Sequence, residues 1–431
     1  MRLPQDRQLL YRIISGTLAA DFYLIQTPSK RLYEMKQICV IGLGYIGLPT
    51  SSILAAKGYQ VLGVDISQKV VDTINSGRIH ITEPDLDLFV KAAVQSGKLR
   101  ASLTPEKSDV FIIAVPTPFK EDKKPDMSFV QAATENLVKF LQPGNLVILE
   151  STSPPKTCED IISPIIKKAG FVPGRDVFLA HCPERVLPGQ IMREVVENDR
   201  VIGGLTPACA EKARQLYSSF VKGQIHITDS NTAEMVKLVE NSFRDVNIAF
   251  ANELSIICER LNLNVWELIK LANLHPRVNI LRPGPGVGGH CIAVDPWFIV
   301  DACPNEAKLI KTARLVNDSK PEHVVSKVVQ AAGRLKNPVI GILGLAYKQD
   351  IDDLRESPAV EIAHRLKEMN TGKLMVCEPF CQKHPDFELF QLEQVLKQAD
   401  ILVLLVAHQQ FRKIAPEILK PKIVIDTCGI W

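Results

Sequence analysis

The chain has 431 residues, a formal net charge of +3 and 46% hydrophobic residues. This length exceeds what one hydrophobic core usually serves, so two or three domains are expected. The near-neutral charge, without a basic stripe interleaved with aromatic residues, argues against a nucleic-acid partner. No apolar run reaches the roughly 18 residues that a membrane span requires, so no membrane partner is expected either.

Ten cysteines are scattered along the chain without the clustered spacing of a disulfide framework, which favours a reducing cytoplasm. Cys377, Cys381 and His384 lack a fourth ligand at zinc-like spacing, so we expect no metal site.

Residues 1–34 precede the first regular pattern. Residues 9–25 are fairly apolar, but Arg12 and Asp21 interrupt them, unlike the core of a signal sequence. Met35 stands directly before the first expected strand. We interpret residues 1–34 as a leader outside the fold, either an upstream start or a loosely docked arm.

From residue 36 short β-branched runs alternate with helix-length segments, which predicts a parallel sheet with helices on both faces. We assign residues 35–205 to this domain. Strands are expected at 38–41, 60–64, 110–115, 146–149 and 177–180, and helices at 49–57 and 129–140.

The first predicted strand is followed by a dinucleotide fingerprint with glycines at Gly42, Gly44 and Gly47. These glycines permit a tight turn, close approach of backbone to a pyrophosphate and close packing of the next helix. Asp65 closes the second strand, where a carboxylate accepts hydrogen bonds from ribose hydroxyls and repels a 2′-phosphate. The alternative is a glycine turn of purely structural origin, but this context predicts NAD as the cofactor.

Residues 206–318 are predicted to form a helical middle domain. Residues 232–261 contain no glycine or proline, which predicts a spine helix roughly 45 Å long that can also offer a face to a second subunit in a homodimer. Lys237, Asn241 and Arg244 share one side of it and can bind an anion or an oxyanion. An ordinary solvent-exposed helix face is the alternative interpretation.

The glycine-rich residues 284–295 present Cys291 as a candidate nucleophile. We expect the glycine amides to lower the thiol pKa and cradle negative charge, and Asp295 to orient a water or a cation. Most free cysteines are instead buried hydrophobes. His290 can act as a base or bond locally. Glu184 follows a strand and can activate water, and Arg185 can bind phosphate or keep that carboxylate ionised.

A second α/β unit is predicted over residues 335–431, with strands near 340–345, 374–377, 401–405 and 423–425 and a helix at 359–369. Residues 341–346 lack the fingerprint spacing, so this unit is expected to hold another nucleotide. A charged loop follows its first strand, where open sheets bind ligands, although a solvated loop is the alternative. Its residues are Lys348, Asp350, Asp352, Asp353 and Arg355. The predicted fold class is α/β, with two Rossmann-like parallel-sheet domains joined by a helical middle domain.

Six segments resemble the UDP-sugar 6-dehydrogenases of the UDP-glucose/GDP-mannose dehydrogenase family, a likeness that covers residues 36–431. They are 150–154 (Glu-Ser-Thr-Ser-Pro), 182–189 (Cys-Pro-Glu-Arg-Val-Leu-Pro-Gly), 240–249 (Glu-Asn-Ser-Phe-Arg-Asp-Val-Asn-Ile-Ala), 275–279 (His-Pro-Arg-Val-Asn), 284–297 and 353–358 (Asp-Leu-Arg-Glu-Ser-Pro). Lys156 stands where the family usually has glycine, so the loop near Thr152 is expected to differ in shape.

The resemblance implies roles for individual residues. Cys291 would be the nucleophile, Lys237 the oxyanion stabiliser and proton shuttle, Asn241 and Asp295 its assistants, and Glu184 the group that directs the hydrolytic water. The implied NAD contacts, beside the glycines, are Tyr45, Ile46, Asp65, Thr117 and Thr152, with Arg355 reaching the NAD of a neighbouring subunit. The implied sugar-nucleotide contacts are Arg185, Val186, Lys237, Asn241, Arg244, Gly288 and Lys348, with His275 and Arg277 reaching across the dimer.

The implied activity is a four-electron, NAD-dependent oxidation of the C6 alcohol of a UDP-sugar to a carboxylate, through a thiohemiacetal and a thioester on Cys291. UDP-N-acetyl-D-mannosamine is the first expected substrate, with UDP-N-acetylglucosamine or UDP-glucose as alternatives, and the product would serve surface polysaccharide synthesis. Two other classes stay open at this point: a two-electron hydroxy-acid-type dehydrogenase, which needs no thiol, and an NAD-sensing module without activity.

Overall fold

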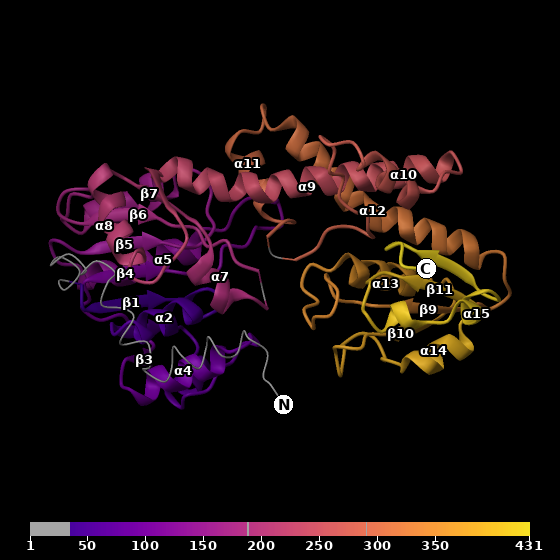
Figure 1. The fold of residues 1–431 in the computed structure, drawn as a ribbon, viewed down its shortest axis with the longest axis horizontal. Helices are drawn as coiled ribbons and strands as arrows, with labels where there is room; N and C mark the ends of the chain where they lie inside the picture. The colour runs from indigo at the N-terminus through magenta and orange to yellow at the C-terminus, as the bar shows by residue number, and fades with distance from the viewer. Residues whose placement is uncertain (1–34, 188, 290) are drawn as a thin grey trace.

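The computed structural model describes residues 35–187, 189–289 and 291–431, so the expectations for residues 1–34 and His290 lie outside the described residues. Two α/β lobes lie at opposite ends of the molecule, and two long helices, α9 (Ser230–Arg260) and α12 (Lys308–Ala332), run along one side and connect them (Figure 1). The predicted fold class is confirmed. The spine helix differs from its predicted bounds by only one or two residues because its sequence contains no helix breaker.

The first lobe contains an eight-stranded sheet in the order β3-β2-β1-β4-β5-β6-β7-β8. The strands are β1 (Gln37–Ile41), β2 (Gln60–Val64), β3 (Leu99–Ser102), β4 (Val110–Ile113), β5 (Leu146–Leu149), β6 (Phe178–His181), β7 (Arg200–Gly204) and β8 (Ile225–Asp229). Strands β1 to β6 are parallel, whereas β7 pairs antiparallel with β6. The sequence pattern did not predict this reversal, because alternation of strands and helices does not encode strand direction.

Residues 206–229 join this sheet, although the sequence pattern assigned them to the middle domain. Helix α8 (Pro207–Tyr217) packs on β6 and β7, and β8 pairs with β7. Strand β8 alternates Ile225 and Ile227 with polar residues, which is the signature of a half-exposed strand. We therefore propose that the middle domain begins at Ser230, where α9 begins.

Helices cover both faces of the first sheet. Ile38 and Val40 of β1 belong to one hydrophobic cluster, and Cys39 and Ile41 to another, as expected for a strand that is buried on both sides. The covering helices are α2 (Gly47–Ala56), α3 (Gln68–Asn75), α4 (Leu86–Gln95), α5 (Ser128–Leu137), α6 (Ser163–Lys168) and α7 (Ile191–Glu197). A 3₁₀ turn (Val138–Phe140) continues α5, and a π-helical turn (Cys158–Ile162) precedes α6.

The second lobe has a four-stranded parallel sheet in the order β10-β9-β11-β12. Its strands are β9 (Val339–Leu343), β10 (Lys373–Cys377), β11 (Ile401–Leu404) and β12 (Ile423–Asp426), and its helices are α13 (Pro358–Glu368), α14 (Leu392–Gln398) and α15 (Pro416–Leu419), with a 3₁₀ turn at Phe411–Lys413.

The middle domain also contains α10 (Val265–Ala272) and α11 (Asp295–Ala302). Helices α11 and α12 both pack against α9, which brings the segment around Cys291 to the face of the spine helix that carries Lys237 and Asn241. Within the described ranges, no helix is both long enough and apolar enough to span a bilayer.

Candidate active site

The glycine loop between β1 and α2 has the shape of a dinucleotide cradle. Gly42 has φ +95°, and an added Cβ would lie 2.4 Å from the carbonyl oxygen of Ala114. A Cβ on Gly47 would lie 1.8 Å from the carbonyl oxygen of Gly42. A Cβ on Gly44, by contrast, would meet no atom within 4 Å. The outer glycines are therefore required for packing, and the middle one faces open space that a pyrophosphate can approach.

Asp65 lies at the carboxyl end of β2, beside this loop. Its two carboxylate oxygens accept hydrogen bonds from the N–H groups of Leu43 (3.2 Å) and Ser67 (2.9 Å). Each oxygen keeps a free lone pair, and the residue is only partly buried. Asp65 can thus hold the hydroxyls of an adenine ribose. The loop and this carboxylate together fit NAD.

Cys291 lies in a turn immediately before α11. Its carbonyl accepts hydrogen bonds from the N–H groups of Val294 (3.1 Å) and Asp295 (2.9 Å), which ties the cysteine to the start of the helix. The residue is solvent-exposed. Burial of the sulfur and the charge of Asp295 nevertheless raise the thiol pKa, and Lys237 opposes this rise. Our expectation of a lowered pKa is therefore wrong, because desolvation exceeds the effect of the nearby cations.

Three residues that the sequence pattern selected come together beside the thiol. The side-chain amide of Asn241 donates a hydrogen bond to Asp295 at 2.5 Å, and both side chains are buried. Burial raises the pKa of Asp295 to about 7, while Asn241 and Lys237 oppose the rise. A carboxyl group with this pKa can both accept and release a proton near neutral pH. Arg244, one turn further along α9, is exposed and also opposes the rise in the Cys291 pKa.

Glu184 is held by a partner that sequence reasoning missed. Its carboxylate forms an ion pair with Arg200 at 2.6 Å, and both residues are more than 90% buried. Arg185, the expected partner, gives Glu184 only its backbone N–H (2.9 Å), and its guanidinium pairs with Glu240 instead (2.7 Å). Arg200 is the first residue of β7, whereas Glu184 lies in the loop after β6. No local sequence pattern connects these two positions.

A second buried carboxyl group lies close to Arg200. The guanidinium of Arg200 lies 5.3 Å from the ring centroid of Tyr217, whose hydroxyl donates a hydrogen bond to Glu150 at 2.6 Å. Burial, and after it the nearby charge of Glu184, raise the pKa of Glu150 to about 7. Arg200 is thus paired with Glu184, while burial favours the protonated form of Glu150.

The C-terminal lobe closes over the glycines that precede Cys291. A Cβ on Gly288 would lie 2.3 Å from the carbonyl oxygen of Glu356 and 2.8 Å from Pro358, and one on Gly289 would lie 2.8 Å from the ring of Tyr347. These glycines therefore allow contact between two domains.

Arg355 affects groups of its own chain. It forms an ion pair with Asp353 at 2.6 Å. Burial raises the pKa of Tyr45 in the cofactor loop, and Arg355 is the main group that opposes this rise. Arg355 also opposes the rise in the Cys291 pKa. Arg355 therefore lies near the cofactor loop of its own chain, and its implied contact with the NAD of a neighbouring subunit stays a prediction.

Several residues implied by the resemblance lie apart from this group within one chain. His275 and Arg277 are exposed beyond α10, where the ring of His275 accepts the N–H of Arg277 at 3.3 Å. Lys348 is exposed after β9, and Val186 packs against the core of the first lobe. Thr117, Thr152 and Ile46 are partly buried.

One buried cluster has the residue types of a metal site. Ligand atoms of Cys158, His181 and Glu234 lie within 4.8 Å of one another. Burial lowers the pKa of His181 to about 3 and raises that of Glu234 to about 7, and it also raises that of the Cys158 thiol. All three neutral forms are therefore favoured, as in a buried polar cluster, and we assign no metal to it.

Comparison with known proteins identifies the family. Residues 36–221 match the NAD binding domain of the UDP-glucose/GDP-mannose dehydrogenase family, residues 231–319 its central domain and residues 341–431 its UDP binding domain. The chain belongs to this family. It is an NAD-dependent dehydrogenase, as the fit of the glycine loop and Asp65 to NAD also indicates.

Individual relatives are similar over nearly their whole length. The chain is 56% identical to the NDP-N-acetyl-D-galactosaminuronic acid dehydrogenase of Ralstonia nicotianae, over 92% of this chain and 97% of the relative. It is 54% identical to the UDP-N-acetyl-D-mannosamine dehydrogenase of Campylobacter jejuni, over 88% of this chain and 97% of that relative. The structure of the UDP-N-acetyl-mannosamine dehydrogenase Cap5O from Staphylococcus aureus superposes with a TM-score of 0.85 at 46% identity, covering 92% of this chain and 95% of that one.

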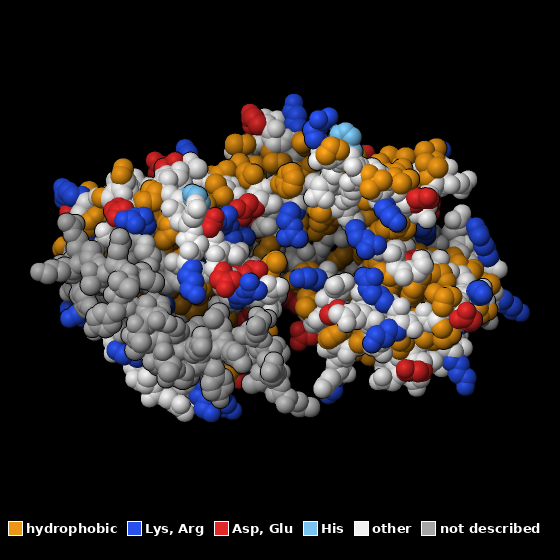
Figure 2. All heavy atoms as spheres, viewed as in Figure 1, with side chains coloured by type: hydrophobic (Ala, Val, Ile, Leu, Met, Phe, Trp, Pro, Cys, Tyr) orange, Lys and Arg blue, Asp and Glu red, His pale blue; other side chains and the backbone are white. Residues whose placement is uncertain are grey.

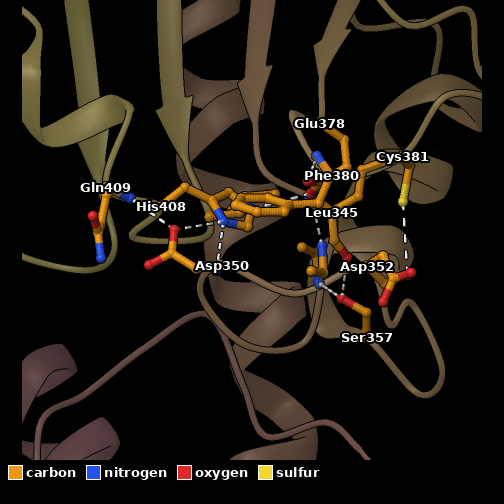
Figure 3. A network of polar contacts seen from close by, with 12 residues as sticks. Leu345, Asp350, Asp352, Ser357, Glu378, Phe380, Cys381, His408 and Gln409 are labelled. Carbon is orange, nitrogen blue, oxygen red and sulfur yellow. Dashed lines mark hydrogen bonds and ion pairs between the residues drawn. The ribbon is translucent and has the colours of Figure 1, made fainter. Parts of the chain in front are cut away.

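The UDP binding domain of this dehydrogenase differs from the NAD binding domain at the position equivalent to Asp65. Glu378 follows β10 and accepts N–H groups from Leu345 (2.6 Å), Ala346 (3.0 Å) and Phe380 (3.0 Å) (Figure 3). The fully buried ring of His408 also contacts it, at 3.2 Å. Because Glu378 is enclosed in this way, it has no room for ribose hydroxyls, which supports the prediction that this domain binds a nucleotide differently.

Proposed function

We propose that this dehydrogenase oxidises the C6 primary alcohol of a UDP-sugar to a carboxylate in two successive two-electron steps. The observation that carries the proposal is the position of Cys291, an exposed residue, beside the buried Asn241–Asp295 pair and Lys237. A simple alcohol dehydrogenase needs no thiol, whereas a thiol that traps the aldehyde allows a second oxidation at the same site.

When bound, NAD⁺ would accept the hydride, with a separate NAD⁺ molecule for each of the two oxidations. In the first oxidation, the C6 hydroxyl gives its proton to Lys237 or Asp295 as the hydride leaves. This step produces the aldehyde. Cys291 then adds to the carbonyl carbon, and its proton passes to the same pair. Lys237 stabilises the oxyanion of the resulting thiohemiacetal.

Loss of a second hydride converts the thiohemiacetal into a thioester. Water then attacks the thioester carbon, the carbon–sulfur bond breaks, and the acid and the free thiol are released. We assign the water-directing role to Glu184, because its ion pair with Arg200 holds the carboxylate in one orientation. The balance is one alcohol, one water and two NAD⁺ converted into one carboxylate, two NADH and three protons.

The proposed ligand contacts follow the domains. We assign Gly42, Gly44, Tyr45, Ile46, Gly47, Asp65, Thr117, Thr152 and Arg355 to NAD, and Arg185, Val186, Lys237, Asn241, Arg244, His275, Arg277, Gly288 and Lys348 to the sugar nucleotide. Arg185 is already paired with Glu240, so contact with a phosphate would require it to exchange partners.

UDP-N-acetyl-D-mannosamine is the substrate we propose, in agreement with the name of the Campylobacter jejuni relative. The Ralstonia nicotianae relative carries a galactosaminuronic name, so UDP-N-acetylgalactosamine belongs in the assay with UDP-N-acetylglucosamine and UDP-glucose. Parallel NADH assays with product chromatography should give two NADH per UDP-N-acetyl-D-mannosamine. A preference for any of the other three sugars would reject this substrate assignment.

Replacement of the nucleophile tests the chemistry. Cys291→Ser should abolish acid formation, because a hydroxyl is a poorer nucleophile and its ester a poorer acyl donor than a thioester. Cys303→Ser is the matched control, since this cysteine is also exposed and lies outside the site. Sustained acid formation by the Cys291→Ser enzyme would reject the scheme. One NADH per sugar in the parent enzyme would indicate a two-electron dehydrogenase, and no turnover would indicate an NAD-sensing module.

A homodimer is supported by an exposed apolar stripe on α9. Its members follow a four- and seven-residue spacing and therefore share one face of the helix; they are Val239, Phe243, Phe250, Ile257 and Leu261, with exposed fractions of 45–68%. Hydrophobic side chains gather along the same edge of the molecule, over α9, α10 and α11 (Figure 2). Light scattering should give twice the chain mass, and Phe243→Asp should lower it. A parent protein of single-chain mass would reject the dimer.

We also propose a cytoplasmic location and a role in forming uronic acid sugars for surface polysaccharides. The ten free thiols fit a reducing compartment. Fractionation of the native cells would detect a different location.

A further inference from the structure

The two long helices share a row of buried polar side chains. Arg314 of α12 forms an ion pair with Asp245 of α9. Asn317 donates to the carboxylate of Asp245 (2.8 Å) and to its backbone carbonyl (3.0 Å), and Asn252 donates to Asn317 (2.8 Å). None of the four is more than 1% exposed. We call these four residues the polar ladder.

The polar ladder contacts both ends of the segment that carries the nucleophile. Asn252 accepts the backbone N–H of Gly284 at 2.8 Å, at the start of the segment. Arg314 donates to the backbone carbonyl of Ile292 at 3.3 Å, one residue beyond Cys291. The intervening Gly288 packs against the C-terminal lobe. The backbone on both sides of the thiol is thus attached to the spine helix pair.

Stability alone does not explain why these groups are polar. Burying an arginine and an aspartate costs solvation free energy, and apolar side chains of similar volume often join two helices equally well. Apolar side chains cannot, however, hydrogen-bond a peptide group. The glycines at 284, 286, 288 and 289 provide no side chains to anchor the segment, so its backbone groups are the available attachment points.

We propose that the polar ladder holds the Cys291 sulfur in register with Lys237, Asn241 and Asp295, which makes Arg314 and Asn252 positioning residues for the nucleophile. This inference rests on the proposed role of Cys291. Lys237 and Asn241 lie on α9, as do Asp245 and Asn252, so one rigid helix carries both the assisting groups and the attachment points of the thiol segment. A displacement of about 1 Å at a reacting group can reduce a rate by about 100-fold, so a rigid attachment has a catalytic effect.

The test compares the reactivity of two cysteines in one chain. Iodoacetamide labelling of Cys291 and of Cys303 is followed by peptide mass spectrometry in the absence of NAD and sugar. Arg314→Lys keeps the charge but loses the planar group that reaches both Asp245 and Ile292, and Asn252→Ala removes the attachment of Gly284. The control Asp318→Asn removes the half-exposed partner of Arg314 at 2.8 Å and leaves the polar ladder intact.

We expect the labelling rate of Cys291 relative to Cys303 to rise at least about threefold in both polar-ladder variants, because the released thiol escapes the desolvation that raises its pKa. Turnover should fall about tenfold or more in the same variants, with the KM for NAD unchanged. Asp318→Asn should change neither by more than about twofold. Buried Cys39 should stay unlabelled throughout, which separates local release from global unfolding.

A labelling ratio that stays at the parental value in Asn252→Ala overturns the proposal, whatever happens to turnover. Asn252→Ala keeps the buried Arg314–Asp245 ion pair, so it can be measured even if Arg314→Lys does not fold. Labelling requires neither cofactor nor substrate. A shifted ratio in a chain without UDP-sugar turnover would therefore reject the proposed function and leave the polar ladder assignment standing.

Discussion

Arg200 and Glu184 form an ion pair at 2.6 Å in which both side chains are almost completely buried. The pair connects the first residue of β7 to the loop after β6, and it orients the carboxylate to which we assign water activation.

Removing one partner of this ion pair should lower the free energy of unfolding. Arg200→Met should lower the free energy of unfolding by about 3–5 kcal/mol, because it leaves the Glu184 charge buried without a partner. Urea unfolding measures the change. Arg100→Met, which breaks the exposed Arg100–Glu106 pair at 2.5 Å, should change it by at most about 1 kcal/mol. Similar losses in the two variants would show that burial is not the cause.

Two glycines of the cofactor loop should respond differently to alanine. Gly44→Ala should leave thermal stability unchanged and raise the KM for NAD, because its Cβ enters only the space assigned to the pyrophosphate. Gly42→Ala should cost at least about 2 kcal/mol, because φ is +95° and the Cβ meets the Ala114 carbonyl. Calorimetry and initial rates separate the two effects. An unchanged KM in Gly44→Ala would argue against pyrophosphate binding at this loop.

Lys156 stands where the family usually has glycine, and its backbone conformation accounts for that preference. It adopts φ +72°, a left-handed conformation that glycine tolerates and lysine does not favour. Lys156→Gly should therefore raise the free energy of unfolding by about 0.5–1 kcal/mol, the left-handed cost less the entropy of an added glycine. Lys167→Gly, inside helix α6, should lower it by about 1 kcal/mol. Denaturant midpoints that fall in both variants would contradict this explanation.

Activity should depend on the protonation of Asp295, whose pKa is raised to about 7. The anion can accept a proton, so kcat should rise as the pH increases from 6 to 8. Asp295→Asn should lower kcat and remove the inflection near pH 7. The folded protein keeps a proton that the unfolded chain has lost above pH 4, so this group's contribution to stability should decrease as the pH rises from about 4 to 7. A parental inflection that persists in Asp295→Asn would assign it to another group.

Sequence periodicity predicted most of the fold. The predicted bounds of β2 and β5 match the structure, and those of α9 differ by one or two residues, because the two strands are strongly apolar and the helix is long and contains no glycine or proline. Strand β8 was missed, since Ile225 and Ile227 give only two apolar positions in a half-exposed strand. Strands β3 and β7 were also missed, and so was the antiparallel direction of β7, because strand direction depends on the path of the connecting chain.

The site residues also fall into those that the sequence predicted and those that only the structure revealed. Local spacing was sufficient to select Gly42, Asp65, Lys237, Asn241 and Cys291, since each belongs to a motif whose geometry is set within a few residues or along one helix. Only the tertiary structure revealed Arg200 and Arg314. A buried arginine has no local signature, because its pairing carboxylate comes from a segment distant in the chain. The pKa of Cys291 depended in the same way on desolvation by the folded lobes, which no run of glycines can indicate.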